Sequence, residues 1–210
     1  MPKSYILLSI KVYKKMKDVI LNLAENNAGI ITSAIANKHN INNSTLAYWL
    51  KKGLLEKTER GVYVLAEHIE DEFITFQSVY KKGIYSLQSA LFLLSLTDRT
   101  PYNFSMTFPA RYNISSPKRK GIFCTQVTES LYEVGKTILK TPCGNEVFAY
   151  NAERSLCDIL KTRNQIDIET VTTAFKMYAN SKEQNLHLLS EYSKLFHVEK
   201  KVRAYMEVLL

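Results

Sequence analysis

Hydroxyl and cationic side chains between residues 44 and 60 have the clearest chemical potential in this chain. Ser44, Thr45 and Tyr48 share the outward face of a predicted helix, and Lys51 and Lys52 follow at its end. Outward groups near the start of such a helix suit base edges or sugars, and lysines at its end suit phosphates, so the pattern predicts contacts to duplex DNA. Two alternatives stay open: Tyr48 packs at a domain interface, or the lysines form a solvated helix end that complements the helix dipole.

A second pair of cations, Lys57 and Arg60, lies in a segment that predicts a β-hairpin over residues 54–65. Apolar residues alternate with polar ones along it, and Gly61 can supply the positive φ that a tight turn needs. An arginine at such a tip suits both the minor groove and its phosphates. We therefore expect Lys57 and Arg60 to contact DNA.

Three predicted helices position these side chains. A short second helix begins at Thr32 or Ser33 as its cap, and Ile41 plugs the turn that follows. The first helix is predicted from apolar residues at i, i+4, i+7, i+8 and i+11. Its inward face is formed by Val12, Met16, Val19, Ile20 and Leu23.

The third helix carries the outward hydroxyl and cationic groups, and Asn43 is its predicted N-cap. Leu46 and Leu50, one turn apart, are expected to face inward, with Trp49 at the edge of the same core. Together with the hairpin, these helices predict a winged helix-turn-helix domain. The domain spans residues 1–80, including a linker helix at its end.

These residues resemble the N-terminal domain of AbiEi-type antitoxins, the antitoxin half of type IV, abortive-infection toxin–antitoxin systems. In the first domain the resemblance rests on Gly29, Ser44-Thr45-Leu46, Gly53, Leu55 and Arg60-Gly61-Val62-Tyr63. Beyond it, the resembling runs are Gly83-Ile84-Tyr85-Ser86, Ser89-Ala90-Leu91, Met106-Thr107-Phe108-Pro109-Ala110-Arg111 and Glu153-Arg154-Ser155-Leu156-Cys157-Asp158. Residues 113–120 are more basic than this pattern, and the last fifty residues match it only in helical character.

The resemblance implies a repressor that binds inverted repeats upstream of its own operon. It implies that the second domain is required for antitoxicity and assists DNA binding. The functional partner would be a nucleotidyltransferase-like toxin, countered without a stable complex.

The charge distribution supports a polyanionic partner and a domain boundary. The net charge is +8, and residues 1–65 carry ten Lys and Arg against four acids. Residues 66–80 are acidic, and residues 81–150 are basic again. The acidic segment predicts a seam between a first domain, residues 1–80, and a second domain, residues 81–210.

The second domain is predicted to be α+β, with strands first and helices last. Ser86 caps an apolar helix over 87–96 that must lie in the core, and Asn151 and Asp167 are expected to cap later helices. The expected strands are 102–108, 121–127, 131–134, 137–141 and 146–150, and the expected helices are 151–163, 168–179, 184–195 and 199–209.

Basic residues of the second domain are further candidates for DNA contacts. Arg111 follows the first of these strands, and Lys118, Arg119 and Lys120 form a basic run in a predicted loop. A solvated loop and a DNA contact are both consistent with this run. In the second case these cations extend one positive stripe from the wing. Such a stripe raises the affinity for DNA through counterion release but adds little sequence specificity.

No motif of an established enzyme class stands in the sequence. There is no Gly-rich phosphate loop, no GxSxG and no HExxH, so we expect neither catalysis nor a cofactor or metal. The best polar cluster, Glu153, Arg154 and Asp158, predicts an ion pair within one helix between Arg154 and Asp158. Three cysteines without a CxxC favour a reducing compartment, and no stretch approaches the roughly 18 apolar residues of a membrane span, so the cytoplasm is expected.

Three functions fit these patterns. The first is an autorepressor that is also a type IV antitoxin, and the second is a winged-helix regulator of another operon whose C-terminal domain binds a ligand or protein. The third is an adaptor whose winged helix binds protein, which would not need the excess of cations in residues 1–65. No long amphipathic dimer helix stands out, so a monomer that pairs on DNA is expected.

Overall fold

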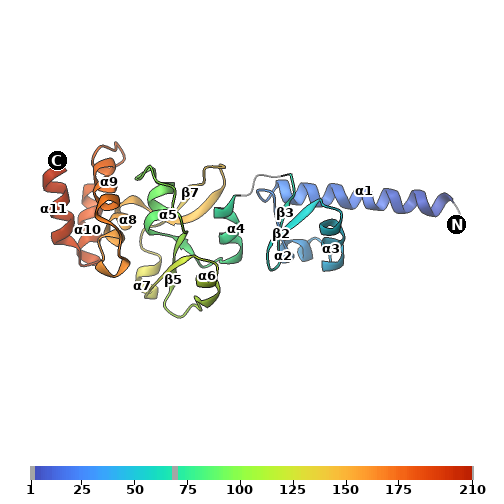
Figure 1. Ribbon diagram of the computed structural model, residues 1–210, viewed down its shortest axis with the longest axis horizontal. Coiled ribbons are helices and arrows are strands. Elements are labelled where there is room, and N and C mark those ends of the chain that lie inside the picture. Colours follow the sequence, from blue (N-terminus) through green and yellow to red (C-terminus); the bar gives the residue numbers. More distant parts are fainter. Residues whose placement is uncertain (1–2, 68–70, 210) are drawn as a thin grey trace. The chain divides into compact units, whose positions relative to one another are not determined.

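The computed structural model describes residues 3–67 and 71–209, and the side chains of these residues except those of 3–12 and 163. The chain divides into two compact units, Met1–Val79 and Tyr80–Leu210. Figure 1 shows the elements of both units in chain order.

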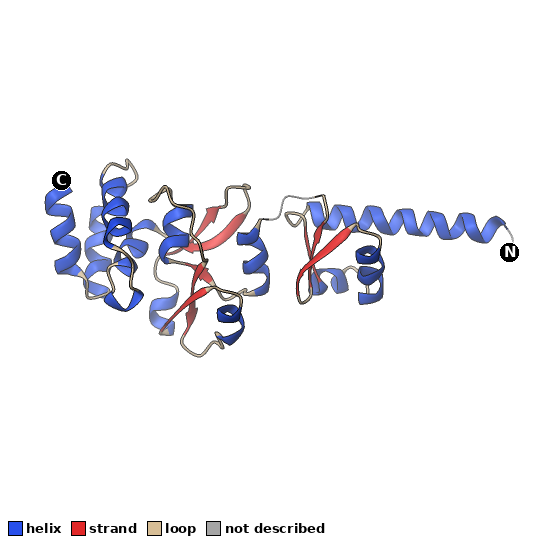
Figure 2. Ribbon diagram, in the orientation of Figure 1, coloured by secondary structure: helices blue, strands red, loops and turns tan. Residues whose placement is uncertain are grey.

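The first unit combines helices with a small antiparallel sheet (Figure 2). Its sheet has the order β1-β3-β2, so β3 pairs with both neighbours. The arrangement is a winged helix-turn-helix, in which α2 and α3 form the helix pair and β2 and β3 form the wing. The elements are α1 (Lys3–Glu25), β1 (Ile30–Thr32), α2 (Ser33–Lys38), α3 (Asn43–Lys51), β2 (Leu55–Glu59), β3 (Val62–Leu65) and α4 (Glu72–Val79).

The core of the first unit lies where α1 meets α2, α3 and the sheet. Ile20 on α1, Ile41 in the turn and Leu46 on α3 are almost completely buried in one cluster. The predicted inward face of the first helix is confirmed by Met16, Val19, Ile20 and Leu23, which all belong to or pack against this cluster. The side chain of Val12 lies outside the described residues.

The first unit contains a strand that the sequence did not predict. The strand β1 is an addition: it pairs with β3, Ile30 opposite Val64 and Thr32 opposite Val62, and so joins the segment before α2 to the wing. Three residues are too few to show a strand periodicity, which is why the sequence does not reveal it. The predicted linker helix includes residues 68–70, which lie outside the described residues, and α4 is described from Glu72.

The second unit is a mixed five-stranded sheet with the order β6-β5-β4-β8-β7. The pairs β5–β6 and β4–β8 are parallel, whereas β4–β5 and β7–β8 are antiparallel. The elements are β4 (Ile84–Tyr85), α5 (Leu87–Leu93), β5 (Ser105–Pro109), α6 (Ser115–Arg119), β6 (Phe123–Val127), α7 (Glu129–Tyr132), β7 (Lys136–Lys140), β8 (Glu146–Tyr150), α8 (Ala152–Ile159), α9 (Ile168–Ala179), α10 (Leu186–Leu195) and α11 (Glu199–Leu209).

The main core of the second unit joins α5 to the C-terminal helices. Leu91 of α5, Leu156 of α8, Phe175 of α9 and Val202 of α11 belong to one buried cluster. The expectation that the apolar helix after Ser86 is central is therefore confirmed, and so is the α+β class with helices last.

Some boundaries in the second unit were predicted wrongly. Residues 131–134 are not a strand, because α7 spans Glu129–Tyr132 there. The basic run at residues 117–120 is not a loop but the end of the short helix α6. Ser86 occupies the cap position of α5 but makes no side-chain capping bond, and its hydroxyl instead accepts a hydrogen bond from Thr107 at 2.9 Å. Asn151 and Asp167 do cap α8 and α9, as expected.

Candidate nucleic-acid interface

The start of α3 is held by one side chain, Asn42. Its Oδ1 accepts hydrogen bonds from the Thr45 amide at 2.9 Å, the Thr45 hydroxyl at 2.8 Å and the Ser44 hydroxyl at 2.7 Å. The N-cap is thus Asn42 and not the predicted Asn43, since an N-cap residue has extended backbone angles and Asn43 is already helical. Ser44 and Thr45 therefore lie in the first turn of α3.

The inward face of α3 is formed by Leu46 and Trp49. Leu46 is fully buried and Trp49 is 8% exposed, whereas Leu50 is 37% exposed. The expected inward pair of Leu46 and Leu50 is therefore wrong, and Trp49 is part of the core instead of its edge. The helix ends at Lys51, so Leu50 lies in its last turn. In this turn Trp49, three residues after Leu46, faces the core, and Leu50, four residues after it, does not.

Tyr48 packs inside the first unit. Its ring lies 5.2 Å from that of Tyr13 on α1 and 5.1 Å from that of Trp49, the latter in an edge-to-face arrangement. The ammonium of Lys52 lies 5.8 Å from the centre of the Tyr48 ring. Tyr48 is consequently half-buried, with part of its ring still accessible beside Ser44 and Thr45.

The four candidate cations of the first unit are all exposed. Lys51 ends α3, Lys52 caps it, Lys57 lies in β2 and Arg60 lies in the turn between β2 and β3. On α1, Lys14 and Lys17 are exposed as well, although their spacing alone did not single them out. Each of the four side chains predicted to contact DNA in this unit is therefore exposed.

The wing is fixed in shape but has little net charge. Gly61 has a φ of 76°, and its carbonyl accepts a hydrogen bond from the Ser33 amide at 2.8 Å, which ties the wing tip to the start of α2. Glu56 and Glu59 lie on the same strand as Lys57, so β2 offsets the charge of Lys57 and Arg60. The basic residues alone do not reveal this balance of charge. Because of it, α3 is the stronger source of positive charge.

In the second unit the candidate cations fall into two groups. Arg111 follows the carboxyl end of β5, in a turn held by Gln126, whose amide donates to the carbonyls of Ala110 and Tyr112 at 2.8 and 3.0 Å. Lys118, Arg119 and Lys120 precede the amino end of β6 and are exposed. Because β5 and β6 run parallel, the two groups lie at opposite ends of a strand pair and do not form one cluster.

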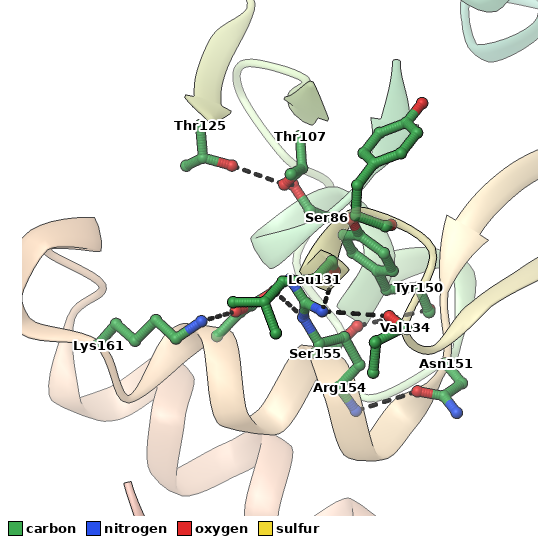
Figure 3. A network of polar contacts seen from close by, with 12 residues as sticks. Ser86, Thr107, Thr125, Leu131, Val134, Tyr150, Asn151, Arg154, Ser155 and Lys161 are labelled. Carbon is green, nitrogen blue, oxygen red and sulfur yellow. Dashed lines mark hydrogen bonds and ion pairs between the residues drawn. The ribbon is translucent and has the colours of Figure 1, made fainter. Parts of the chain in front are cut away.

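The polar cluster of α8 is a buried structural network (Figure 3). Arg154 is fully buried; its Nε donates to Asp158 at 2.7 Å, and its Nη1 donates to the carbonyls of Leu131 and Val134 at 2.8 and 3.1 Å. Lys161 contacts the other oxygen of Asp158. The predicted ion pair between Arg154 and Asp158 within α8 is confirmed, and the hydrogen bonds from Arg154 to the two carbonyls join α8 to the end of α7.

The same helix also carries a carboxyl group and a thiol, those of Glu153 and Cys157, that are buried in the core. Glu153 accepts a hydrogen bond from the Tyr178 hydroxyl at 2.9 Å inside the core. Burial raises the pKa of the Cys157 thiol to about 12 and that of Cys124 to about 11, so both are poor nucleophiles near neutral pH. Within residues 3–67 and 71–209, no group of three His, Cys, Asp or Glu side chains is placed to hold a metal ion.

No helix in the described part of the chain is both long enough and apolar enough to cross a bilayer. No curated protein matches the chain. The fold is similar to that in the crystal structure of the RV2827C protein from Mycobacterium tuberculosis, with a TM-score of 0.53 and 12% sequence identity over 90% of this chain and 79% of that one. At this identity the likeness shows a shared fold alone.

The first unit also matches a sequence family. Residues 18–66, which run from the middle of α1 to the end of the wing, match the family described as transcriptional regulator, AbiEi antitoxin. This segment contains α2, α3 and the wing, the elements that carry the candidate DNA contacts of the first unit. Over these residues the chain is therefore similar to AbiEi-type antitoxin regulators, the family that its sequence resembles.

Proposed function

We propose that this protein is a DNA-binding transcriptional autorepressor and the antitoxin of a type IV, abortive-infection toxin–antitoxin system. The observation that carries the proposal is the match of residues 18–66 to AbiEi antitoxin regulators, on a winged helix whose α3 ends in exposed lysines. Repressor activity would follow from binding inverted repeats upstream of its own operon.

Several features of the first unit support DNA as the ligand. Lys51, Lys52 and Arg60 are exposed around α3 and the wing tip, and Lys14 and Lys17 are exposed on α1. Residues 1–65 carry ten basic against four acidic side chains. Cations on the two sides of a recognition helix can contact the phosphates that flank a major groove, while hydroxyls at its start meet base edges.

The second unit is proposed to carry antitoxicity. The toxin would be nucleotidyltransferase-like and would be countered without a stable complex, as the family resemblance implies. Arg111 and the run Lys118, Arg119 and Lys120 are proposed as additional phosphate contacts, which would strengthen binding without selecting sequence. The protein is proposed to be a cytoplasmic monomer that pairs on DNA.

Footprinting on the DNA upstream of its own gene tests the repressor. We expect the purified full-length protein to protect an inverted repeat there, and a promoter fusion to be repressed when the protein is supplied. Full promoter activity and no protected region at low salt would contradict the proposal. Light scattering with and without the protected DNA tests the change from monomer to pair.

One observation favours a second candidate, a winged-helix regulator that senses a ligand. The second unit has a hollow of about 460 Å³ whose lining includes Lys161, His197 and Lys201 beside Leu131 and Phe196. Its size lies in the range of small-molecule sites. A metabolic operon downstream, in place of a nucleotidyltransferase-like reading frame, together with DNA release by a metabolite of that operon, would favour this regulator.

A further inference from the structure

An aromatic hollow of about 340 Å³ lies beside the start of α3. The rings of Tyr13 and Tyr48 pack on each other along one side of it, with their centres 5.2 Å apart, and Trp49 meets Tyr48 edge to face. Tyr13 is 50% exposed and Trp49 is 8% exposed, so the hollow has an open rim and an apolar base. It is lined by Tyr13, Met16, Ser44, Thr45, Tyr48 and Trp49.

Two of the hydroxyl groups in this hollow, those of Ser44 and Thr45, are committed as donors. Ser44 and Thr45 both direct their hydroxyl hydrogens to Oδ1 of Asn42, at 2.7 and 2.8 Å. A hydroxyl has one hydrogen and two lone pairs, so each oxygen is left as an acceptor. The hollow therefore combines apolar surface with acceptors that require a donor from a ligand.

Among the base pairs of DNA, A·T presents both matching groups in the major groove. Adenine offers its N6 amino donor, and thymine offers its C5 methyl group. A G·C pair offers the cytosine amino group but no methyl. Exposed Lys14 and Lys17 on α1, close in sequence to Tyr13, would lie beside a backbone that passes the hollow.

We propose that this hollow reads one A·T pair in each half-site of the operator. The thymine methyl would lie against Tyr13 and Tyr48, and the adenine amino group would donate to the hydroxyl of Ser44 or Thr45. The assignment rests on the proposed DNA-binding function and adds to it the base pair that α3 and α1 select together.

The test uses the full-length protein and operator DNA in which thymines are replaced, one at a time, by deoxyuridine, which lacks only the methyl group. We expect wild-type affinity to fall roughly four-fold at one thymine in each half-site, the effect of one buried methylene-sized group. Replacing the paired adenine by purine, which lacks the amino group, should weaken binding at the same pair.

Two tyrosine variants connect the effect to the hollow. Tyr13→Ala should bind the thymine and uracil operators equally, because it removes one wall of the hollow. Tyr102→Ala is the matched control: Tyr102 is 99% exposed and lies in the second unit, so this variant should keep the four-fold preference. Thermal melting of both variants checks that they fold.

The outcomes separate this assignment from the function on which it rests. Operator binding that tolerates uracil at every position would contradict the assignment and leave the repressor intact. A uracil effect that persists undiminished in folded Tyr13→Ala would also contradict it. Absence of operator binding by the wild-type protein would contradict both.

Discussion

The residues of α3 divide between holding the helix and meeting a ligand, and some do both. Ser44 and Thr45 donate to Asn42 and so stabilise the helix start, while their oxygens stay available. Tyr48 packs on Tyr13 and Trp49 but keeps an accessible edge. Lys51 is exposed and ends the helix. The cationic residues are therefore the ones whose removal should change DNA binding without changing the fold.

Lys51→Ala and Arg60→Ala test the phosphate contacts. Each variant should weaken operator binding, and the slope of log affinity against log salt should fall by about one unit per lost contact, because fewer counterions are released. Gel-shift titrations at several salt concentrations measure both quantities. Lys194→Ala, an exposed lysine on α10, is the control and should change neither. Unchanged affinity and slope in both test variants would remove Lys51 and Arg60 from the interface.

Arg154 has a structural function, and its removal should change the free energy of unfolding. It is fully buried, stacks between the rings of Tyr150 and Phe196 at 4.4 and 4.0 Å, and shares Asp158 with Lys161. Arg154→Met should lower the free energy of unfolding by about 3–5 kcal/mol, since it leaves two buried carbonyls without their donor and Asp158 with Lys161 as its remaining cationic partner. Urea unfolding measures the loss.

The control for Arg154 is another Arg–carboxylate pair with the same spacing. Arg203 and Glu199 are 3.4 Å apart on α11 and largely exposed. Arg203→Met should change stability by no more than about 0.5 kcal/mol, as exposed pairs usually do. Equal effects of the two substitutions would contradict the view that the α8 network holds the second unit together.

At the scale of elements, long periodic segments were predictable and short ones were not. The sequence predicts α9 with its observed ends, because its apolar positions repeat over three turns and Asp167 marks its start. It misses β4 and assigns α7 to a strand, because two and four residues are too short to show a period. Tertiary contacts fix α7 instead, because Arg154 donates hydrogen bonds to the carbonyls of Leu131 and Val134.

The candidate site shows the same limit. The exposed cations and the wing follow from residue types and spacing, since charge stays in water and glycine marks the turn. The choice between Leu50 and Trp49 as the inward partner of Leu46 does not follow, because it depends on where the helix ends relative to the core. The aromatic contact of Tyr13 with Tyr48 joins distant positions, so no local pattern reveals it.

The junction between α7 and β7 gives a test at this scale. Gly135 has a φ of 75°, and a Cβ added there would lie 2.7 Å from Cβ of Arg154. Gly144 has a φ of 84° with nothing within 4 Å of an added Cβ. Both substitutions to Ala cost about 1–2 kcal/mol for the left-handed backbone, and Gly135→Ala should cost at least a further 1 kcal/mol or so for overpacking. Thermal melting compares them; equal losses would mean that α8 does not crowd this turn.

At the scale of the whole molecule, the chain joins a winged helix to a larger α+β unit. The candidate recognition residues of α3 and the wing belong to the first unit, and the buried Arg154 network belongs entirely to the second. Each unit has a hydrophobic cluster of its own. We therefore expect that substitutions in one unit separate repression from antitoxicity, the two activities that the proposed function combines.

A full-length variant with Lys51→Ala, Lys57→Ala and Arg60→Ala makes that separation. It should lose repression of its promoter, because three exposed cations of the first unit are gone, and it should still protect cells from the toxin. Both variant and wild type are expressed from an unrelated promoter at matched levels, so that lost autorepression does not alter the dose. Survival during toxin induction and reporter activity are then measured in parallel. A folded variant that fails to protect would mean that antitoxicity acts through DNA binding, and that the second unit does not carry it independently.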